Sequence, residues 1–176
     1  MKNSILKFLF AIIIPLLLGG TRNGMTSIKS IQQDAKPDEQ LRTYKNEAFK
    51  RGEKLTYRMH YGFINAGEVV MQVLDENKQI GSRNTLHVVG LGYTNSSFDW
   101  FYMVRDKYES YIDEDAIIPW VFIRHVREGG YSLNQNQIYN HYKNTVDSDG
   151  KNFDVPDNVQ DMMSAFYYAR TMDFSN

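Results

Sequence analysis

Apolar and polar side chains alternate along much of the chain after residue 50. In Glu53–Tyr61, the apolar positions are Leu55, Tyr57, Met59 and Tyr61, and the polar positions are Lys54, Thr56, Arg58 and His60. A period of two separates the two kinds onto opposite faces, so the segment predicts a half-buried β-strand. Gly62–Gly67 has turn chemistry and Glu68–Leu74 is rich in β-branched residues. Together these runs predict a β-hairpin.

Later runs of the same kind are separated by polar segments that contain glycine, which are typical of turns. They predict four more strands: Thr85–Thr94, Val104–Ile112, Trp120–Arg127 and Tyr131–Tyr142. Between the strands, Asp75–Asn84 predicts a turn, and Asn95–Tyr102 predicts a loop or a short helical turn. Gly90 and Gly92 share one face of their strand, which indicates a bend or the close approach of another element. The predicted sheet is therefore strongly curved.

The pattern changes its period near the C-terminal end. Apolar residues at helical spacing predict one face of a helix, formed by Val159, Met162, Met163 and Phe166. Asp157 is the expected N-cap, with Gln160 as its capping-box partner. We expect this helix to pack on the concave or open side of the sheet. The predicted fold is mainly β (α+β): a curved, barrel-like antiparallel sheet of about six strands followed by one packed C-terminal helix.

The first 48 residues lack these patterns. Lys2 and Lys7 precede the apolar run Phe8–Leu18, and small residues follow it. This layout predicts a secretory signal peptide over residues 1–24, with an uncleaved anchor as the alternative. Residues 25–48 are polar and predict a linker, with a short helix near Glu39–Tyr44 as the alternative, which leaves residues 49–176 for the folded domain. We expect an exported protein, periplasmic or associated with the outer membrane, with no transmembrane span in the mature chain.

Composition narrows the chemistry. The chain has 176 residues, which is room for one domain, and its formal net charge of −1 offers no basic field for nucleic acid. Cysteine is absent from the sequence, which excludes disulfides, thiol catalysis and zinc–thiolate sites. Aromatic residues make up 14% of the chain, which favours a structure rich in strands.

Several segments, in the same order, match the motifs of a known family. They are Phe49–Glu68, Arg105–Ile112, Pro119, Arg124, Glu128–Gly129 before Tyr131, and Val159–Arg170. In these segments the chain resembles the bacterial exported "domain of unknown function 3108" family. The resemblance implies an envelope protein built from a curved, barrel-like antiparallel sheet. The family has no agreed activity, so the resemblance implies no catalytic residues.

Members of that family continue past the helix with further strands, whereas this sequence stops at Asn176. The resemblance thus implies a sheet that is shortened at its C-terminal end. An unclosed sheet exposes unpaired edges, which favour aggregation. Three explanations fit this expectation: a fragment, a truncated and non-functional copy, or a short variant that is sufficient by itself.

The titratable residues form no catalytic or metal-binding motif in the sequence. The histidines are far apart and fit ordinary strand positions: His60, His87, His125 and His141. Among the acidic residues, Asp106 and Glu109 would face opposite sides of one strand, Asp113–Asp115 fits a solvated turn, and Asp147–Gly150 fits a plain turn. We therefore predict no catalytic residue, metal or cofactor. The alternative is an envelope hydrolase whose carboxylate or histidine groups converge only on folding.

The aromatic residues are the candidates for binding. The proposed ligand-facing residues are Trp100, Tyr102, Trp120 and Phe122, of which Trp120 and Phe122 are expected to share one strand face. The alternative interpretation is that these side chains fill the interior of a small curved sheet. The predicted function is a non-catalytic binding or structural module of the cell envelope, with a lipid-like, glycan or protein partner and no nucleic acid.

Overall fold

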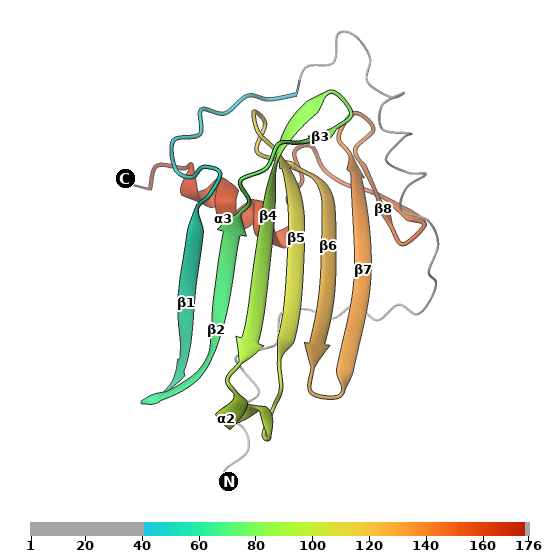
Figure 1. Ribbon diagram of the computed structural model, residues 1–176. Helices are drawn as coiled ribbons and strands as arrows, with labels where there is room; N and C mark the ends of the chain where they lie inside the picture. The colour runs from blue at the N-terminus through green and yellow to red at the C-terminus, as the bar shows by residue number, and fades with distance from the viewer. Residues whose placement is uncertain (1–40, 175–176) are drawn as a thin grey trace.

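The computed structural model describes residues 41–174, which form one antiparallel sheet and a C-terminal helix (Figure 1). The strands follow the order β1-β2-β4-β5-β6-β7-β8-β9, and β3 pairs with β4. The elements are β1 (Lys54–Tyr61), β2 (Ile64–Val73), β3 (Lys78–Ile80), β4 (Arg83–Thr94), α2 (Ser96–Asp99), β5 (Arg105–Asp113), β6 (Pro119–Glu128), β7 (Tyr131–Asn140), β8 (Thr145–Ser148), β9 (Lys151–Asp154) and α3 (Met162–Arg170). The predicted class is confirmed, and the described sheet is not closed. The predicted signal peptide lies outside the described residues.

The sheet has nine strands, where the sequence predicted about six. β3 lies inside the segment that was predicted to be a turn, and it pairs with the beginning of β4. β8 and β9 form a hairpin of four-residue strands joined at Asp149 and Gly150, whose φ angles are 52° and 83°. Two successive positive φ angles are those of a type I′ turn, the turn that suits tight hairpins. The three strands were missed because they are short and polar.

α3 packs on one face of the sheet, which we call the helix face; the opposite face is the outer face. Figure 1 shows α3 crossing behind the uppermost part of the sheet. Met163 and Tyr167 join a buried cluster with strand residues that include Met71, Val88, Ile112 and Phe122. A Cβ atom at Gly90 would lie 2.8 Å from Cε of Met163. Gly90 therefore marks the close approach of another element, as predicted.

The predicted beginning of the helix is wrong, and its predicted face is wrong for Met162 and Phe166, whereas Met163 is buried and Val159 packs against the core as predicted. The N-cap is Asp161, one turn after Asp157, and Asp161 forms a capping box with Ser164. The buried side chains of α3 are Met163, Ser164 and Tyr167, whereas Met162 and Phe166 are 56% and 36% exposed. The reason is a tertiary contact: Ser110 Oγ on β5 donates to Asp161 Oδ2 over 2.6 Å. This bond fixes the first turn of α3 over β5 and sets which side chains face the sheet.

The expectation that Trp120 and Phe122 share a face is also wrong. Tyr111 pairs with Val121 and Ile112 pairs with Pro119, so Trp120 is an extra residue in a β-bulge. Trp120 belongs to a second buried cluster with Ile80, Val121 and Ile138, and Phe122 belongs to the cluster beneath α3. The bulge places Trp120 on the face opposite to the one that strict alternation would give it. The alternating pattern of the sequence alone does not predict such a bulge.

The segment before β1 has no helix or strand from residue 41 onward. It nevertheless packs on the domain: the backbone N–H of Tyr44 donates to the carbonyl of Asp115, and the Tyr44 and Tyr168 hydroxyls are 2.8 Å apart. Phe49 is part of the core cluster beneath α3. Within residues 41–174, none of the helices has the length and apolar character that crossing a membrane requires.

Candidate functional site

The strand register shows which side chains share the helix face. Because Gly90 lies under Met163, the residues that pair with it in successive strands lie on the same face. This row runs across the sheet through Leu55, Met71, Gly90, Tyr108, Arg124 and Gln135. The next row, away from α3, starts with Tyr57, Val69 and Gly92. α3 covers part of this face, and the candidate site is the part beyond it.

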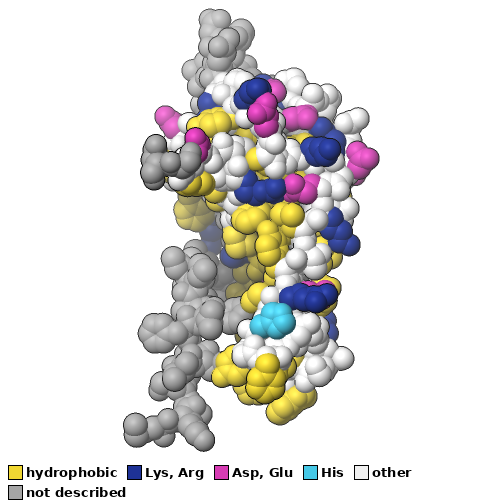
Figure 2. Space-filling model, turned by 90° about the vertical axis from the view of Figure 1, so that its left-hand side faces the viewer, with side chains coloured by type: hydrophobic (Ala, Val, Ile, Leu, Met, Phe, Trp, Pro, Cys, Tyr) yellow, Lys and Arg dark blue, Asp and Glu magenta, His cyan; other side chains and the backbone are white. Residues whose placement is uncertain are grey.

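The β1 end of the helix face carries exposed apolar side chains. Tyr57, Met59 and Tyr61 are 43%, 45% and 58% exposed, and only Leu55 of the predicted buried set packs against the core. The expected burial is thus wrong for Tyr57, Met59 and Tyr61, because only the beginning of β1, at Leu55, packs against the cluster that contains Met163 and Tyr167 of α3. Figure 2 shows hydrophobic side chains gathered on this side of the molecule. We call Tyr57, Met59 and Tyr61 the β1 apolar stripe.

Arg124 occupies the middle of the helix face, on β6. It pairs with Tyr108 on β5 and with Gln135 on β7. Its Nε atom is buried and has no hydrogen-bond partner, and the same holds for Oε1 of Gln135. A buried polar atom without a partner costs free energy, so such atoms in a native fold indicate strain, a missing water or a ligand.

Two carboxyl groups meet near this arginine, from different strands. Glu128 is hydrogen bonded to Asp106, and burial, followed by that hydrogen bond and the neighbouring charge, raises the pKa of Glu128. Like charges at short range favour one shared proton. Asp106 also accepts a bond from the backbone N–H of Arg127 over 2.9 Å. Burial, with the charges of both acids, raises the pKa of the Tyr108 phenol to about 12, so it stays a neutral donor.

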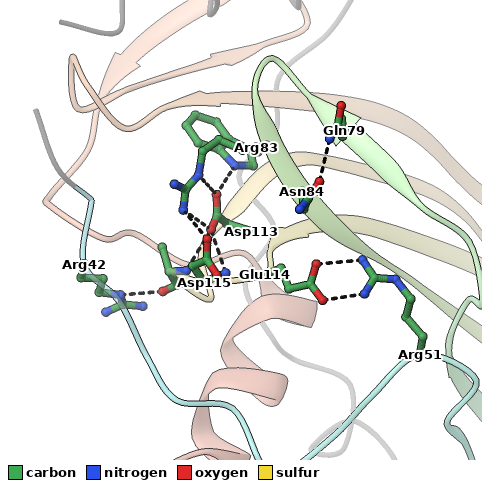
Figure 3. Close-up of polar contacts among 10 residues, drawn as sticks. Arg42, Arg51, Gln79, Arg83, Asn84, Asp113, Glu114 and Asp115 are labelled. Atoms are coloured by element: carbon green, nitrogen blue, oxygen red, sulfur yellow. Dashed lines mark hydrogen bonds and ion pairs between the residues drawn. The ribbon is translucent and has the colours of Figure 1, made fainter. Parts of the chain in front are cut away.

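The opposite end of the sheet holds a second polar cluster, shown in Figure 3. Asp113 is fully buried and accepts two bonds of 2.7 Å from Arg83, one from the Trp120 indole and two from backbone N–H groups. Arg51 and Glu114 form a bidentate pair beside it. The expectation that Asp113 belongs to a solvated turn is therefore wrong. Because the Asp113 carboxylate accepts all five of these hydrogen bonds from within the fold, we assign it a structural role.

The histidines lie in separate places, as their spacing predicted. His87 is largely buried on the outer face between Glu76 Oε1 at 2.6 Å and Glu109 Oε2 at 2.9 Å, and its ring stacks on Tyr111. His141 is buried, and burial lowers its pKa although it contacts the carbonyl of Pro119. Within residues 41–174, no group of three or more acidic or histidine side chains is arranged to hold a metal ion.

The four aromatic candidates lie in three environments. Trp120 and Phe122 are buried in the two core clusters, which is the alternative interpretation stated for them. Trp100 is 83% exposed, in the turn after α2. Tyr102 is exposed and lies near the acidic pair, whose charges raise the pKa of its phenol together with burial, the largest cause. Of the four, Tyr102 is the candidate that adjoins the site.

Sequence reasoning missed Arg124, Gln135 and the Asp106–Glu128 pair as members of one site. These residues lie on three strands, β5, β6 and β7. They come close only because of the register in which these strands pair. The signal that could have found Asp106 and Glu128 is the hairpin of β5 and β6, which places the beginning of one strand beside the end of the other.

The comparisons with known proteins give one match. A family described as "Protein of unknown function (DUF3108)" matches residues 56–175, which is most of the chain. No curated protein and no solved structure is significantly similar to this chain. The match includes the β1 apolar stripe, Arg124, the acidic pair and α3, and it carries no assigned activity.

Proposed function

The chain belongs to the DUF3108 family, and from this premise we propose that it is an exported, non-catalytic binding module of the cell envelope that takes a lipid-like ligand on its helix face. The observation that carries the proposal is the β1 apolar stripe, three large apolar side chains that stay exposed on the face where the core is built. Exposed apolar groups gathered on one face are typical of a binding surface. Export follows from the signal-peptide pattern of residues 1–24.

A lipid-like ligand suits this surface better than a glycan does. Met59 is a flexible side chain with no polar donor, and it lies between two tyrosines. Sugars need several polar groups beside each aromatic ring, whereas the second row of the helix face continues with Val69 and Gly92, which offer no side-chain polar atoms. The surface is therefore apolar from β1 as far as β4.

The test is the uptake of N-phenylnaphthylamine, an uncharged dye that fluoresces in apolar surroundings, by the purified chain. We expect saturable fluorescence, and we expect Tyr57→Ser with Met59→Ser to weaken binding about thirtyfold, because each loses roughly 1 kcal/mol of apolar contact. The matched control is Thr56→Ala with Arg58→Ala, on the opposite face of the same strand, which should bind as the parent does. No dye uptake, or equal loss in both variants, would contradict the proposal.

A second candidate function is hydrolysis of envelope material, and the Asp106–Glu128 pair favours it. Burial, followed by the hydrogen bond to Asp106 and its charge, raises the pKa of Glu128, which is the direction that a general acid requires. Against it, Asp106 already holds the backbone of Arg127, a structural task. Asp106→Asn separates the two functions: it abolishes release of product from envelope extract in a hydrolase and leaves dye binding unchanged in a binding module.

A further inference from the structure

Arg124 differs from the ion-paired arginines of the domain in having a buried donor without a partner. Five arginines each form an ion pair with a carboxylate: Arg51, Arg58, Arg83, Arg105 and Arg170. Between residues 41 and 174, the Arg124 side chain makes neither a hydrogen bond nor an ion pair, and its Nε is buried. An unsatisfied buried donor costs about 1–3 kcal/mol, and more when it is charged. An oxygen atom from outside the chain would relieve that cost.

The surroundings of Arg124 favour an anionic oxygen. Tyr108 and Gln135 flank it in the register, and the acidic pair lies beyond Tyr108. Among the described residues, neither carboxyl group of the pair forms an ion pair with Arg124, and Glu128 is hydrogen bonded to Asp106 instead. A carboxylate matches the planar fork of the guanidinium and accepts two of its hydrogen bonds.

The apolar surface runs from β1 to β4, and Arg124 lies two strands beyond it, on β6. From β6 to β1 the path crosses β5, β4 and β2, four strand spacings or about 19 Å. That distance suits one extended acyl chain. Gly92 adds no side chain to the path, since the nearest atom to a Cβ there would be Asp106 Cβ at 3.8 Å.

We propose, resting on the proposed function, that the ligand is a single-chain amphiphile with a carboxylate head, a long-chain fatty acid. Its carboxylate pairs with Arg124, and its chain lies across the helix face, beyond α3, toward Tyr57 and Met59. The cation selects the head group and the β1 apolar stripe holds the chain end. Recognition thus needs both ends of the row.

The experiment is calorimetric titration of the full chain with three probes below their micelle concentrations. Laurate has the chain and the charge, dodecyl maltoside has the chain with an uncharged head, and acetate has the charge alone. We expect laurate to bind about tenfold more tightly than dodecyl maltoside, the usual gain from a charge-assisted hydrogen bond, and acetate not to bind. Arg124→Gln should remove the preference for laurate, and Arg124→Lys should keep part of it.

Arg127→Gln is the matched control, because Arg127 is exposed on the outer face of the same strand. It should leave all three affinities unchanged. Loss of a donor that has no partner should not unfold the domain, and a melting curve checks this for Arg124→Gln. If Arg124→Gln and the parent bind laurate equally while the Tyr57 and Met59 variants weaken both amphiphiles, the head-group inference fails and the proposed function stands. If neither amphiphile binds, both fail.

Discussion

Asp113 shows how a fully buried carboxylate is kept charged. Burial alone would raise its pKa, but hydrogen bonds from Arg83, from the backbone N–H of Ala116 and from Trp120 outweigh burial and hold the pKa below its ordinary value. Asp113→Asn removes the charge that Arg83 needs and should destabilise the domain by about 3 kcal/mol. Asp115→Asn is the control, because Asp115 is mostly exposed and 3.4 Å from Arg83, and it should cost under about 0.5 kcal/mol. Urea unfolding measures both values.

The lowered pKa of Asp113 also predicts in which direction the stability of the domain changes with pH. A carboxyl group whose pKa is lower in the folded state stabilises the fold above its unfolded value, near 4, and loses this effect as the pH falls through the folded pKa. The difference in unfolding free energy between the parent and Asp113→Asn should be constant from about pH 7 to 5 and should shrink below about pH 4. A difference that persists unchanged to pH 3 would contradict this role for the charge.

At the scale of elements, one hydrogen bond to the sheet fixes the first turn of α3. Asp161 caps the helix and accepts from Ser110, and burial, the largest cause, raises the pKa of Asp161. Asp161→Ala removes the cap and leaves the Ser110 hydroxyl buried without a partner, so it should cost about 2–4 kcal/mol. Asp161→Asn keeps an acceptor without the buried charge and should cost under about 1 kcal/mol. Thermal unfolding that ranks the two variants the other way would contradict this account.

The elements that a local pattern determines were predicted from the sequence, and those that depend on contacts with distant residues were not. Six strands have an alternating pattern and were predicted from it, whereas β3, β8 and β9 owe their strand character to their partners. The choice of Asp161 over Asp157 as N-cap was set by Ser110, 51 residues away. The bulge at Trp120 likewise follows from the pairing of β5 with β6. Contacts across strands decide these features, and a single sequence does not encode them locally.

At the scale of the whole molecule, the candidate site exists only because the sheet brings residues of several strands together. Arg124, Gln135, the acidic pair and the β1 apolar stripe come from the strands β1, β5, β6 and β7, and no motif joins them in the sequence. Of the four aromatic residues predicted to face a ligand, Trp120 and Phe122 fill the core. The exposed Tyr57 and Tyr61 instead lie on β1, at the edge of the sheet, where α3 does not cover them.

The open sheet makes β1 an edge strand within the described residues, with β2 as its partner on one side. Charged side chains on an edge strand oppose pairing with another copy. Arg58 is such a residue, with 71% of its side chain exposed and a loose 3.8 Å contact to Glu68. Arg58→Val should therefore increase self-association, seen as a concentration-dependent shift in light scattering. His125→Val, an exposed outer-face position on the interior strand β6, should not, because both edges of that strand are already paired. Equal association of the two variants would indicate that added hydrophobicity, rather than the edge, drives it.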